Sequence, residues 1–225
     1  MAEAHQLLTQ RTARYFTQRG DGPVRRIWIL LHGHAMLAER FLALLSPMTA
    51  PGTLLVAPEA LSRFYLGTRL DGGHDQQVGA TWMTREERDT EIADVVAYLD
   101  RLLSEVVPSE YPGCPVGILG FSQGVATAGR WLVRGATRPA MLALWGAPLP
   151  ADVTPGLLAP RLGAAPVWLI GGQEDPIVPA GTLEGKARQL QDGGIDTEVH
   201  RFSGGHVLHA ATARALAEHF ALRTP

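Results

Sequence analysis

The sequence predicts an α/β fold in which a mostly parallel β-sheet is flanked by helices. Short apolar segments, typical of strands buried on both faces, alternate along the chain with segments of helical periodicity. Such alternation indicates a doubly wound parallel sheet, because consecutive parallel strands need a crossover between them. With 225 residues and no repeat, low-complexity tract or linker, the chain is expected to form a single domain over residues 1–225, without a separate cap domain.

The first strands are expected near the amino terminus. Residues 6–18 are predicted to be extended and, after a turn at residues 20–23, to form an antiparallel hairpin with an apolar strand over Arg26–Leu31. A helix is expected over residues 38–45 and a short strand over residues 53–57.

A long connection follows over residues 59–84, which has no clean periodicity and contains several glycines. Connections of this length are usually functional or disordered, and its aromatic residues favour an ordered loop. Thr84 and Glu87 have the spacing of a capping box, which predicts the start of a long helix. Its apolar residues recur at helical spacing up to Val107, and Pro108 is expected to end it.

The second half of the chain continues the alternation of strands and helices. Strands are expected over residues 116–119, 141–145, 167–170 and 197–202. Helices are expected over residues 125–134, 182–191 and 208–222. The proline-rich residues 147–166 are expected to be a connection.

The composition excludes several classes of function. With 46% hydrophobic and 19% charged residues the chain reads as an ordinary globular protein, and its net charge of −2 with scattered basic residues predicts neither nucleic acid nor an anionic membrane as partner. No signal-peptide pattern and no apolar run of about 20 residues is present, so no membrane insertion is predicted. The single cysteine excludes an internal disulfide and fits a reducing compartment, so the protein is expected to be cytoplasmic.

One pentapeptide organises the functional prediction: Gly120-Phe121-Ser122-Gln123-Gly124, between a buried strand and a helix of small residues. In this context the pattern indicates a nucleophile elbow, a strand-to-helix turn that holds the serine in a strained backbone conformation. The two glycines remove side chains that would clash in so sharp a turn. The alternative is a glycine-rich turn of an ordinary α/β domain.

A serine hydroxyl becomes a good nucleophile only when a base accepts its proton and an acid orients that base. Asp175 follows the strand over residues 167–170, and His206 follows the strand over residues 197–202. Sites in such sheets lie at the carboxyl ends of the strands. The chain order Ser122, Asp175, His206 is also the α/β-hydrolase order. These residues are therefore predicted to form a catalytic triad.

The chain resembles the phospholipase/carboxylesterase group of α/β-hydrolases, small cytosolic esterases that include the acyl-protein thioesterases. The matching segments are Leu31-His32-Gly33, Gly120-Phe-Ser-Gln-Gly124, Gly172-Gln-Glu-Asp-Pro-Ile-Val-Pro179 and Gly204-Gly-His206. In the family they supply the oxyanion loop, the nucleophile, the acid and the base. The resemblance implies that the backbone N–H groups of His34 and Gln123 form the oxyanion hole. It also implies a small-molecule ester as substrate and no cofactor.

Several neighbouring residues offer alternative assignments. Glu174 could serve as the acid, although Asp175 followed by proline matches the family better. His209, expected inside the last helix, and His200, on a strand, are interpreted as surface or packing residues. The resemblance makes His32 a structural residue of the oxyanion loop.

A thiol nucleophile and a metal site are weaker alternatives. Cys114 suggests the thiol mechanism of the dienelactone hydrolases, which share this fold, but it precedes its strand and is expected to pack. The segments His32-Gly33-His34 and Asp71-Gly-Gly-His74-Asp75 lack convincing ligand spacing, so no metal site is predicted. Residues 71–77 are expected to be a solvated loop.

The substrate pocket is expected beside residues 58–84, because this connection leaves a strand end next to the oxyanion loop. Candidate lining residues are Met36, Phe64, Tyr65, Trp82, Met83 and Leu149. The alternative for each is packing beneath the loop. The connection differs in sequence from that of the acyl-protein thioesterases, which argues against a protein-palmitate substrate.

The sequence therefore predicts a serine carboxylester hydrolase that acts on short to medium acyl esters through an acyl-enzyme. A thioesterase or lysophospholipase would use the same triad with another leaving group. A ligand-binding member of the fold with poor turnover is an alternative from a different class. Apolar surface near the pocket is compatible with a homodimer, although the sequence has no specific motif for one.

Overall fold

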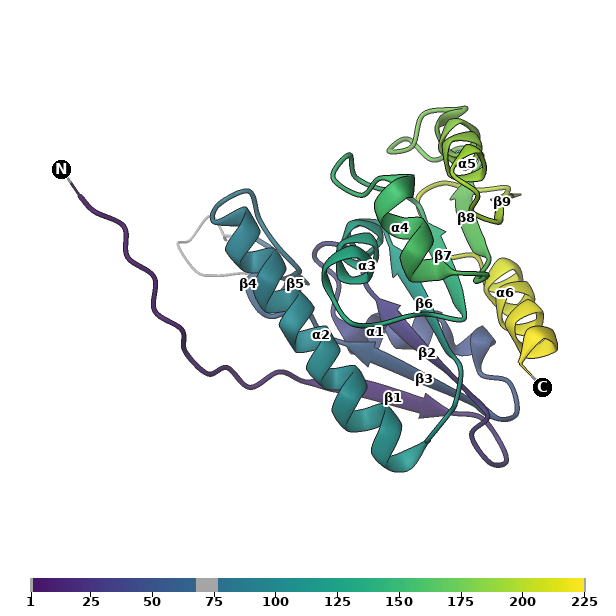
Figure 1. Cartoon of the computed structure of the whole chain (residues 1–225), viewed down its shortest axis with the longest axis horizontal. Helices are drawn as coiled ribbons and strands as arrows, with labels where there is room; N and C mark the ends of the chain where they lie inside the picture. The colour runs from purple at the N-terminus through teal and green to yellow at the C-terminus, as the bar shows by residue number, and fades with distance from the viewer. Residues whose placement is uncertain (1, 68–76, 225) are drawn as a thin grey trace.

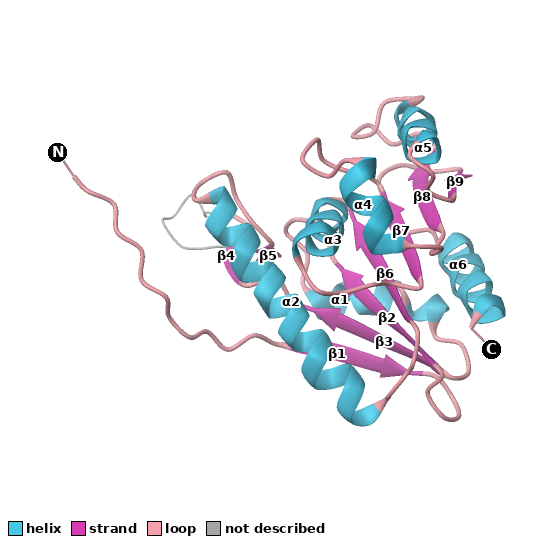
Figure 2. Cartoon of the chain, in the orientation of Figure 1, coloured by secondary structure: helices cyan, strands magenta, loops and turns pink. Residues whose placement is uncertain are grey.

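The computed structural model of the chain describes residues 2–67 and 77–224, without the side chains of residues 106–110. Its centre is a seven-stranded sheet in the order β1-β3-β2-β6-β7-β8-β9 (Figure 2). The strands are β1 (Tyr15–Arg19), β2 (Arg26–Leu31), β3 (Thr53–Pro58), β6 (Val116–Phe121), β7 (Met141–Trp145), β8 (Val167–Gly172) and β9 (Thr197–Phe202). Among these described strands, β1 alone runs antiparallel to its neighbour, as the mostly parallel sheet predicted from the sequence requires.

Helices cover both faces of this sheet (Figure 1). One face carries α2 (Arg88–Glu110), α3 (Gln123–Arg134), α4 (Pro155–Leu162) and α5 (Thr182–Asp192). The other carries α1 (Ala38–Leu44), the short 3₁₀-helix η1 (Ser46–Met48) and α6 (Ala210–Arg223). Within the described residues, no helix has both the length and the apolar composition needed to cross a bilayer.

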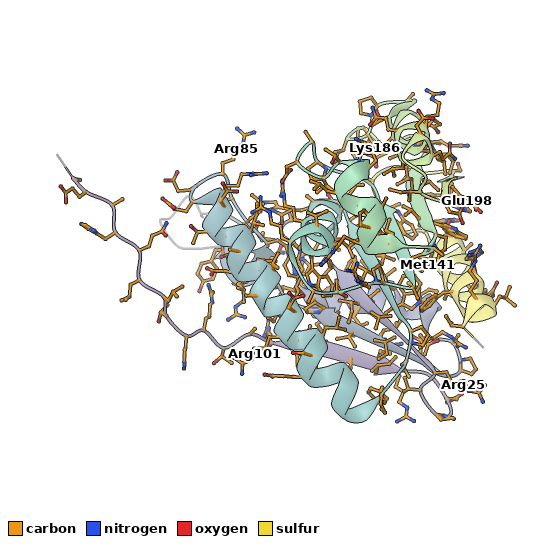
Figure 3. The ribbon with its side chains drawn as sticks, viewed as in Figure 1. Arg25, Arg85, Arg101, Met141, Lys186 and Glu198 are labelled. Carbon is orange, nitrogen blue, oxygen red and sulfur yellow. The ribbon has the colours of Figure 1, made fainter. Side chains whose placement is uncertain are left out.

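The alternation of side chains along β2 divides the core between these two layers. Ile27, Ile29 and Leu31 pack with the first set of helices, whereas Trp28 and Leu30 pack with the second. All these side chains are buried, as expected for a central parallel strand that is covered on both faces. On the outer side of α2, in contrast, the side chain of Arg101 points away from the sheet (Figure 3).

The predicted hairpin between the first two strands is wrong. β1 pairs with β3, with Phe16 opposite Ala57, and β3 in turn pairs with β2. β3 also contacts the turn after β1, because the N–H of Gly20 donates to the carbonyl of Thr53 (2.9 Å). Two segments that are neighbours in sequence thus leave room for a third strand between them.

Both predicted ends of the long helix α2 also differ from the structure. Glu87 has φ of 47°, which is incompatible with a helix, so α2 begins at Arg88 and no capping box forms. The amide and hydroxyl of Thr84 donate instead to the carboxylate of Glu91. Pro108 lies inside the helix, in its last turn, and its missing N–H removes a single helical bond, to the carbonyl of Ser104.

Two connections contain short elements that periodicity did not predict. β4 (Ser62–Tyr65) and β5 (Val78–Thr81) form an antiparallel pair within the long connection after β3. The proline-rich connection contains α4, which begins with Pro155 at its first position, where a proline lacks no helical hydrogen bond. The pair β4–β5 matters most for function, because an isolated bridge joins Ala80 of β5 to Met36 beside β2.

Candidate active site

The elbow after β6 holds Ser122 in a strained backbone conformation. Ser122 has φ of 52° and ψ of −114°, and its N–H donates to the carbonyl of Trp145 on β7 (2.8 Å). A Cβ atom at Gly120 would lie 2.3 Å from the carbonyl oxygen of Gly124. A Cβ atom at Gly124 would lie 2.1 Å from the carbonyl oxygen of Leu31. Both glycines are therefore required by close backbone contacts, as a nucleophile elbow demands.

The loops after β8 and β9 bring Asp175 and His206 together. Nδ1 of His206 lies 2.8 Å from Oδ2 of Asp175, whose side chain is 1% exposed. The other oxygen, Oδ1, accepts the N–H groups of Ile177 (2.8 Å) and Val178 (3.3 Å). Because the carboxylate can only accept, Nδ1 of His206 carries the proton and Nε2 is left free to act as a base.

The ring of His206 lies beside the elbow. Its centroid is 5.0 Å from that of Phe121, the residue before Ser122. A Cβ atom at Gly146 would lie 2.9 Å from Cε1 of His206, so this glycine leaves space for the ring. Among the described residues the Ser122 hydroxyl makes no hydrogen bond to His206; in ligand-free sites such bonds are often long and tighten only with substrate.

The alternative acid lies outside this arrangement. The Glu174 side chain is exposed, and the backbone N–H of Glu174 donates to the carbonyl of Gly204 (3.0 Å). His206 therefore contacts Asp175 and not Glu174.

The two N–H groups implied as an oxyanion hole are free of partners within the described residues. Neither the N–H of His34 nor that of Gln123 donates to a described acceptor, whereas the N–H of Ala35 donates to the carbonyl of Ala80 (2.9 Å). Gln123 is the first residue of α3, so its N–H lies at the positive end of the helix dipole. Both N–H groups are therefore free to donate to a bound group.

His32 is a buried structural residue. Its Nε2 accepts the N–H of Ala60 (3.1 Å), so Nδ1 carries the proton and donates to the carbonyl of Gly33 (2.8 Å). Burial lowers the pKa of this imidazole, which keeps it neutral. The carbonyl of His32 accepts the indole N–H of Trp82 (2.8 Å).

The remaining histidines and the cysteine pack against other groups. His209 precedes α6 instead of lying inside it, and its ring stacks on Phe202 at 5.0 Å. His200 stacks on Trp168 across β8 and β9. Cys114 is half-buried beside the core, away from the carboxyl ends of the strands.

No described cluster of three His, Cys, Asp or Glu residues has the arrangement of a metal site. The second candidate segment, Asp71-Gly-Gly-His74-Asp75, lies outside the described residues, as does most of the loop predicted over residues 71–77.

The six pocket candidates fall into two groups. Phe64 stacks on the ring of His34 at 5.3 Å, Tyr65 is 56% exposed, and Met36 lies next to the oxyanion loop. Met36 and Phe64 lie beside the oxyanion loop, whereas Tyr65, the next residue of β4, has its side chain on the opposite face of the strand. Met36 and Phe64 are therefore the candidates that an incoming substrate could touch.

Of the other three candidates, Trp82 and Leu149 are buried and Met83 is partly buried. Trp82 is 2% exposed, and Leu149 is 3% exposed and lies against α3. Sδ of Met83 lies 2.9 Å from Nη1 of Arg130. A cavity lined by Trp82, Met83, Ile92, Val95, Val96, Thr127 and Arg130 has a volume of about 10 Å³, room for a single water molecule. It is far too small for an acyl chain.

A second hollow of about 400 Å³ lies away from the triad. Its lining residues are Pro139, Ala140, Ala164, Ala165, Pro166, Arg223 and Thr224. Most of them precede β7 and β8, so this hollow opens at the amino ends of the strands, opposite to the loops that carry Asp175 and His206.

A charge cluster next to the site was not predicted from the sequence. The carboxylate of Asp152 accepts two hydrogen bonds from Arg130 (2.9 and 3.0 Å) and one from Arg88 (3.0 Å). The hydrogen bonds from Arg130 hold the pKa of the Asp152 carboxyl well below its usual value of 3.8. These residues come from α2, α3 and the loop before α4, and their spacing in sequence gives no signal of the contact.

Asp152→Asn is expected to lower the free energy of unfolding by about 1–3 kcal/mol at pH 6, because a charge-assisted pair with the buried Arg130 is lost. The folded-state pKa of Asp152 is lowered, so its contribution is fully present above the unfolded-state value and is lost as the pH falls through the folded-state value. Urea unfolding of both proteins at pH 6 and pH 3 should show the difference narrowing at pH 3. An unchanged difference would contradict this linkage.

Comparisons with solved structures show which fold this is. An acyl-protein thioesterase 2 from Zea mays has a TM-score of 0.72 at 19% identity, over 95% of this chain and 100% of that chain. A Bacillus cereus carboxylesterase has a TM-score of 0.69 at 16% identity, over 93% of this chain and 94% of that chain. Esterase PE8 has a TM-score of 0.67 at 22% identity, over 96% of this chain and 100% of that chain. The predicted α/β-hydrolase fold is confirmed.

Sequence comparisons define the family. No curated protein matches this sequence with significance. The model of the dienelactone hydrolase family, in contrast, matches residues 45–219, which include the elbow and both loops that carry Asp175 and His206. The predicted resemblance to small α/β-hydrolase esterases is confirmed, and the chain belongs to the dienelactone hydrolase family.

Proposed function

We propose that the protein is a serine carboxylester hydrolase that acts on short to medium acyl esters. The observation that carries this proposal is the 2.8 Å hydrogen bond between His206 and Asp175, at the sheet edge where Ser122 occupies its strained elbow. Membership of a hydrolase family supports ester or thioester hydrolysis as the type of reaction. In this chain the elbow holds a serine, and Cys114 lies elsewhere, which favours a hydroxyl nucleophile.

In the proposed mechanism, Oγ of Ser122 adds to the ester carbonyl carbon while Nε2 of His206 takes its proton. Asp175 holds Nδ1 of His206 protonated and stabilises the imidazolium that forms. The N–H groups of His34 and Gln123 donate to the oxyanion of the tetrahedral intermediate. The alcohol leaves with the proton from Nε2, and water then attacks the acyl-enzyme by the same steps.

The acyl group is proposed to lie on the surface along Met36 and Phe64. Both side chains are partly exposed, and Phe64 stacks on the His34 ring beside the oxyanion N–H. An open apolar surface of this kind can hold a short chain, while a long chain would leave most of its methylenes in water.

A fluorophosphonate probe tests the nucleophile directly. It is expected to label Ser122 stoichiometrically, because its phosphorus takes the place of the carbonyl carbon and reacts only with an activated serine. Mass spectrometry of the digested protein would locate the label. The matched control is His206→Gln, which should remain folded and lose most labelling because the base is gone. Labelling at another residue, or none in the wild-type protein, would exclude the proposed triad.

A series of p-nitrophenyl esters tests the substrate class. We expect kcat/KM to be highest for acetate to hexanoate and to fall for longer chains, because only Met36 and Phe64 are proposed to hold the acyl chain. Thioesters of the same acyl groups distinguish a thioesterase by a higher kcat/KM at equal chain length. A maximum at palmitate would refute the short-chain proposal, and a single burst of product without turnover would indicate a ligand-binding protein instead.

A further inference from the structure

The side chain of Gln123 joins the elbow to the last residue of β5 and the two residues that follow it. Its Nε2 donates to Oγ1 of Thr81 (2.8 Å) and to the carbonyl of Met83 (2.9 Å), and its Oε1 accepts the N–H of Trp82 (3.1 Å). The hydroxyl of Thr81 in turn donates a hydrogen bond to the carbonyl of Met83 (3.0 Å). One amide thus binds three consecutive residues.

These bonds determine which residue can occupy position 123. The N–H of Trp82 can only donate and the carbonyl of Met83 can only accept, so the amide orientation of Gln123 is fixed by its partners. A side chain of this length must offer both a donor and an acceptor to satisfy them. Glutamine meets that requirement, whereas ionised glutamate has no donor and leucine has neither group.

The segment held by Gln123 also holds the oxyanion loop. Ala80 directly precedes Thr81; its carbonyl accepts the N–H of Ala35 (2.9 Å) and its N–H donates to the carbonyl of Met36 (3.2 Å). A Cβ atom at Gly79 would lie 2.6 Å from the carbonyl oxygen of Ala35, so β5 and the oxyanion loop are in close backbone contact. Ala35 itself has φ of 64°, a conformation that needs support from its surroundings.

We propose that the Gln123 side chain is a positioning group, which sets the distance between the two N–H donors of the oxyanion hole. It connects its own N–H, through residues 80–83, to the loop that presents the N–H of His34. This inference rests on the proposed function, because it assigns a purpose to donors that act only during acyl transfer. The Gln123 side chain acts through the backbone donors and does not touch the reacting atoms.

The expected effect of losing this connection is on the transition state. In the reaction Oγ of Ser122 bonds to the carbonyl carbon, its proton moves to His206, and the carbonyl electron pair becomes the oxyanion between the donors. The ground-state ester makes weaker use of the same donors, so their misplacement should lower kcat and leave KM nearly unchanged. Displacement by about 1 Å costs on the order of 10²-fold in rate.

The primary variant is Gln123→Glu, which keeps the shape and the backbone N–H but removes the side-chain donor. We expect kcat for p-nitrophenyl acetate to fall about 30–100-fold, with KM changed less than about threefold. The Ki of an aryl trifluoromethyl ketone should rise by the same factor, because its adduct with Ser122 carries the oxyanion. Labelling of Ser122 by the fluorophosphonate probe should persist.

A second variant, with a matched control, tests the same connection with a smaller change that is less disruptive to folding. Thr81→Val removes the hydroxyl that bridges Gln123 and Met83, and should lower kcat by about 3–10-fold. Thr137→Val is the matched control, since Thr137 is equally buried and its hydroxyl has no partner among the described residues. It should leave kcat unchanged.

Different results would contradict the positioning role of Gln123 and the proposed esterase function. If the wild-type protein is labelled and active but both Gln123→Glu and Thr81→Val keep kcat within twofold, the positioning role is excluded and the triad stands. A fall in kcat that merely follows the fraction of folded protein excludes it as well. If the wild-type protein is neither labelled nor active, the proposed function fails and the inference fails with it.

Discussion

Ser122→Ala is expected to lower kcat for p-nitrophenyl acetate by a factor on the order of 10⁴–10⁶, as removal of the nucleophile does in another serine triad. Alanine removes only Oγ, so the oxyanion donors and the binding surface remain and KM should change little. Steady-state kinetics at saturating ester would measure the loss. Retention of full activity would mean that another group forms the acyl-enzyme or that no acyl-enzyme exists.

Asp175→Asn is expected to lower kcat by about 10⁴-fold, because an amide facing Nδ1 favours the wrong tautomer of His206. The matched control is Glu174→Gln, one residue earlier, whose carboxylate is exposed and does not contact His206. This control should keep kcat within about twofold, as surface substitutions do. A larger loss of kcat in Glu174→Gln than in Asp175→Asn would identify Glu174 as the acid.

Gly124→Ala is expected to lower the free energy of unfolding by about 3–5 kcal/mol, near the upper limit for overpacking a core. The added Cβ would lie 2.1 Å from the carbonyl oxygen of Leu31, and neither the backbone of β2 nor that of α3 can move away without breaking sheet or helix hydrogen bonds. Urea unfolding followed by circular dichroism would measure the change.

Gly185→Ala is the matched control for that substitution. Gly185 lies in α5, and a Cβ atom there meets no atom within 4 Å. Alanine should stabilise the protein by about 0.5–1 kcal/mol, because it loses less backbone entropy on folding than glycine. If Gly124→Ala unfolds no more easily than wild type, the close packing of the elbow against β2 is wrong.

Much of the sheet could be predicted from the sequence because its strands are buried on both faces. Segments such as residues 141–145 and 167–170 read as continuous apolar runs, and each is a strand of the central sheet. The elbow was predictable for a related reason. Its glycines are required by close contacts within a few residues and with the adjacent strand. This requirement leaves a local pattern of glycines in the sequence.

Features that depend on distant partners, on the backbone angle of one residue or on a very short element left no such pattern. The partner of β1 is decided by the insertion of β3, and the start of α2 by the φ of Glu87 and the reach of Thr84 to Glu91. α4 is short and contains two prolines, so its helical periodicity is too brief to recognise.

Distant partners also explain what was missed at the site. The Gln123 side chain had no assigned role because its partners lie some forty residues earlier in the chain, in a segment without clean periodicity. The bonds between Arg130 and Asp152 join an α3 side chain to a loop, and only the folded chain brings them together.

The backbone of Ser122 has a consequence for engineering. A φ of 52° with ψ of −114° costs a non-glycine residue about 1–3 kcal/mol, a large fraction of the 5–15 kcal/mol by which a domain of this kind is stable. Glycine at this position would relieve the strain and abolish the nucleophile. Selection of a library for thermal stability alone would therefore favour inactive sequences at residue 122. A screen for more stable variants has to measure catalytic activity at the same time.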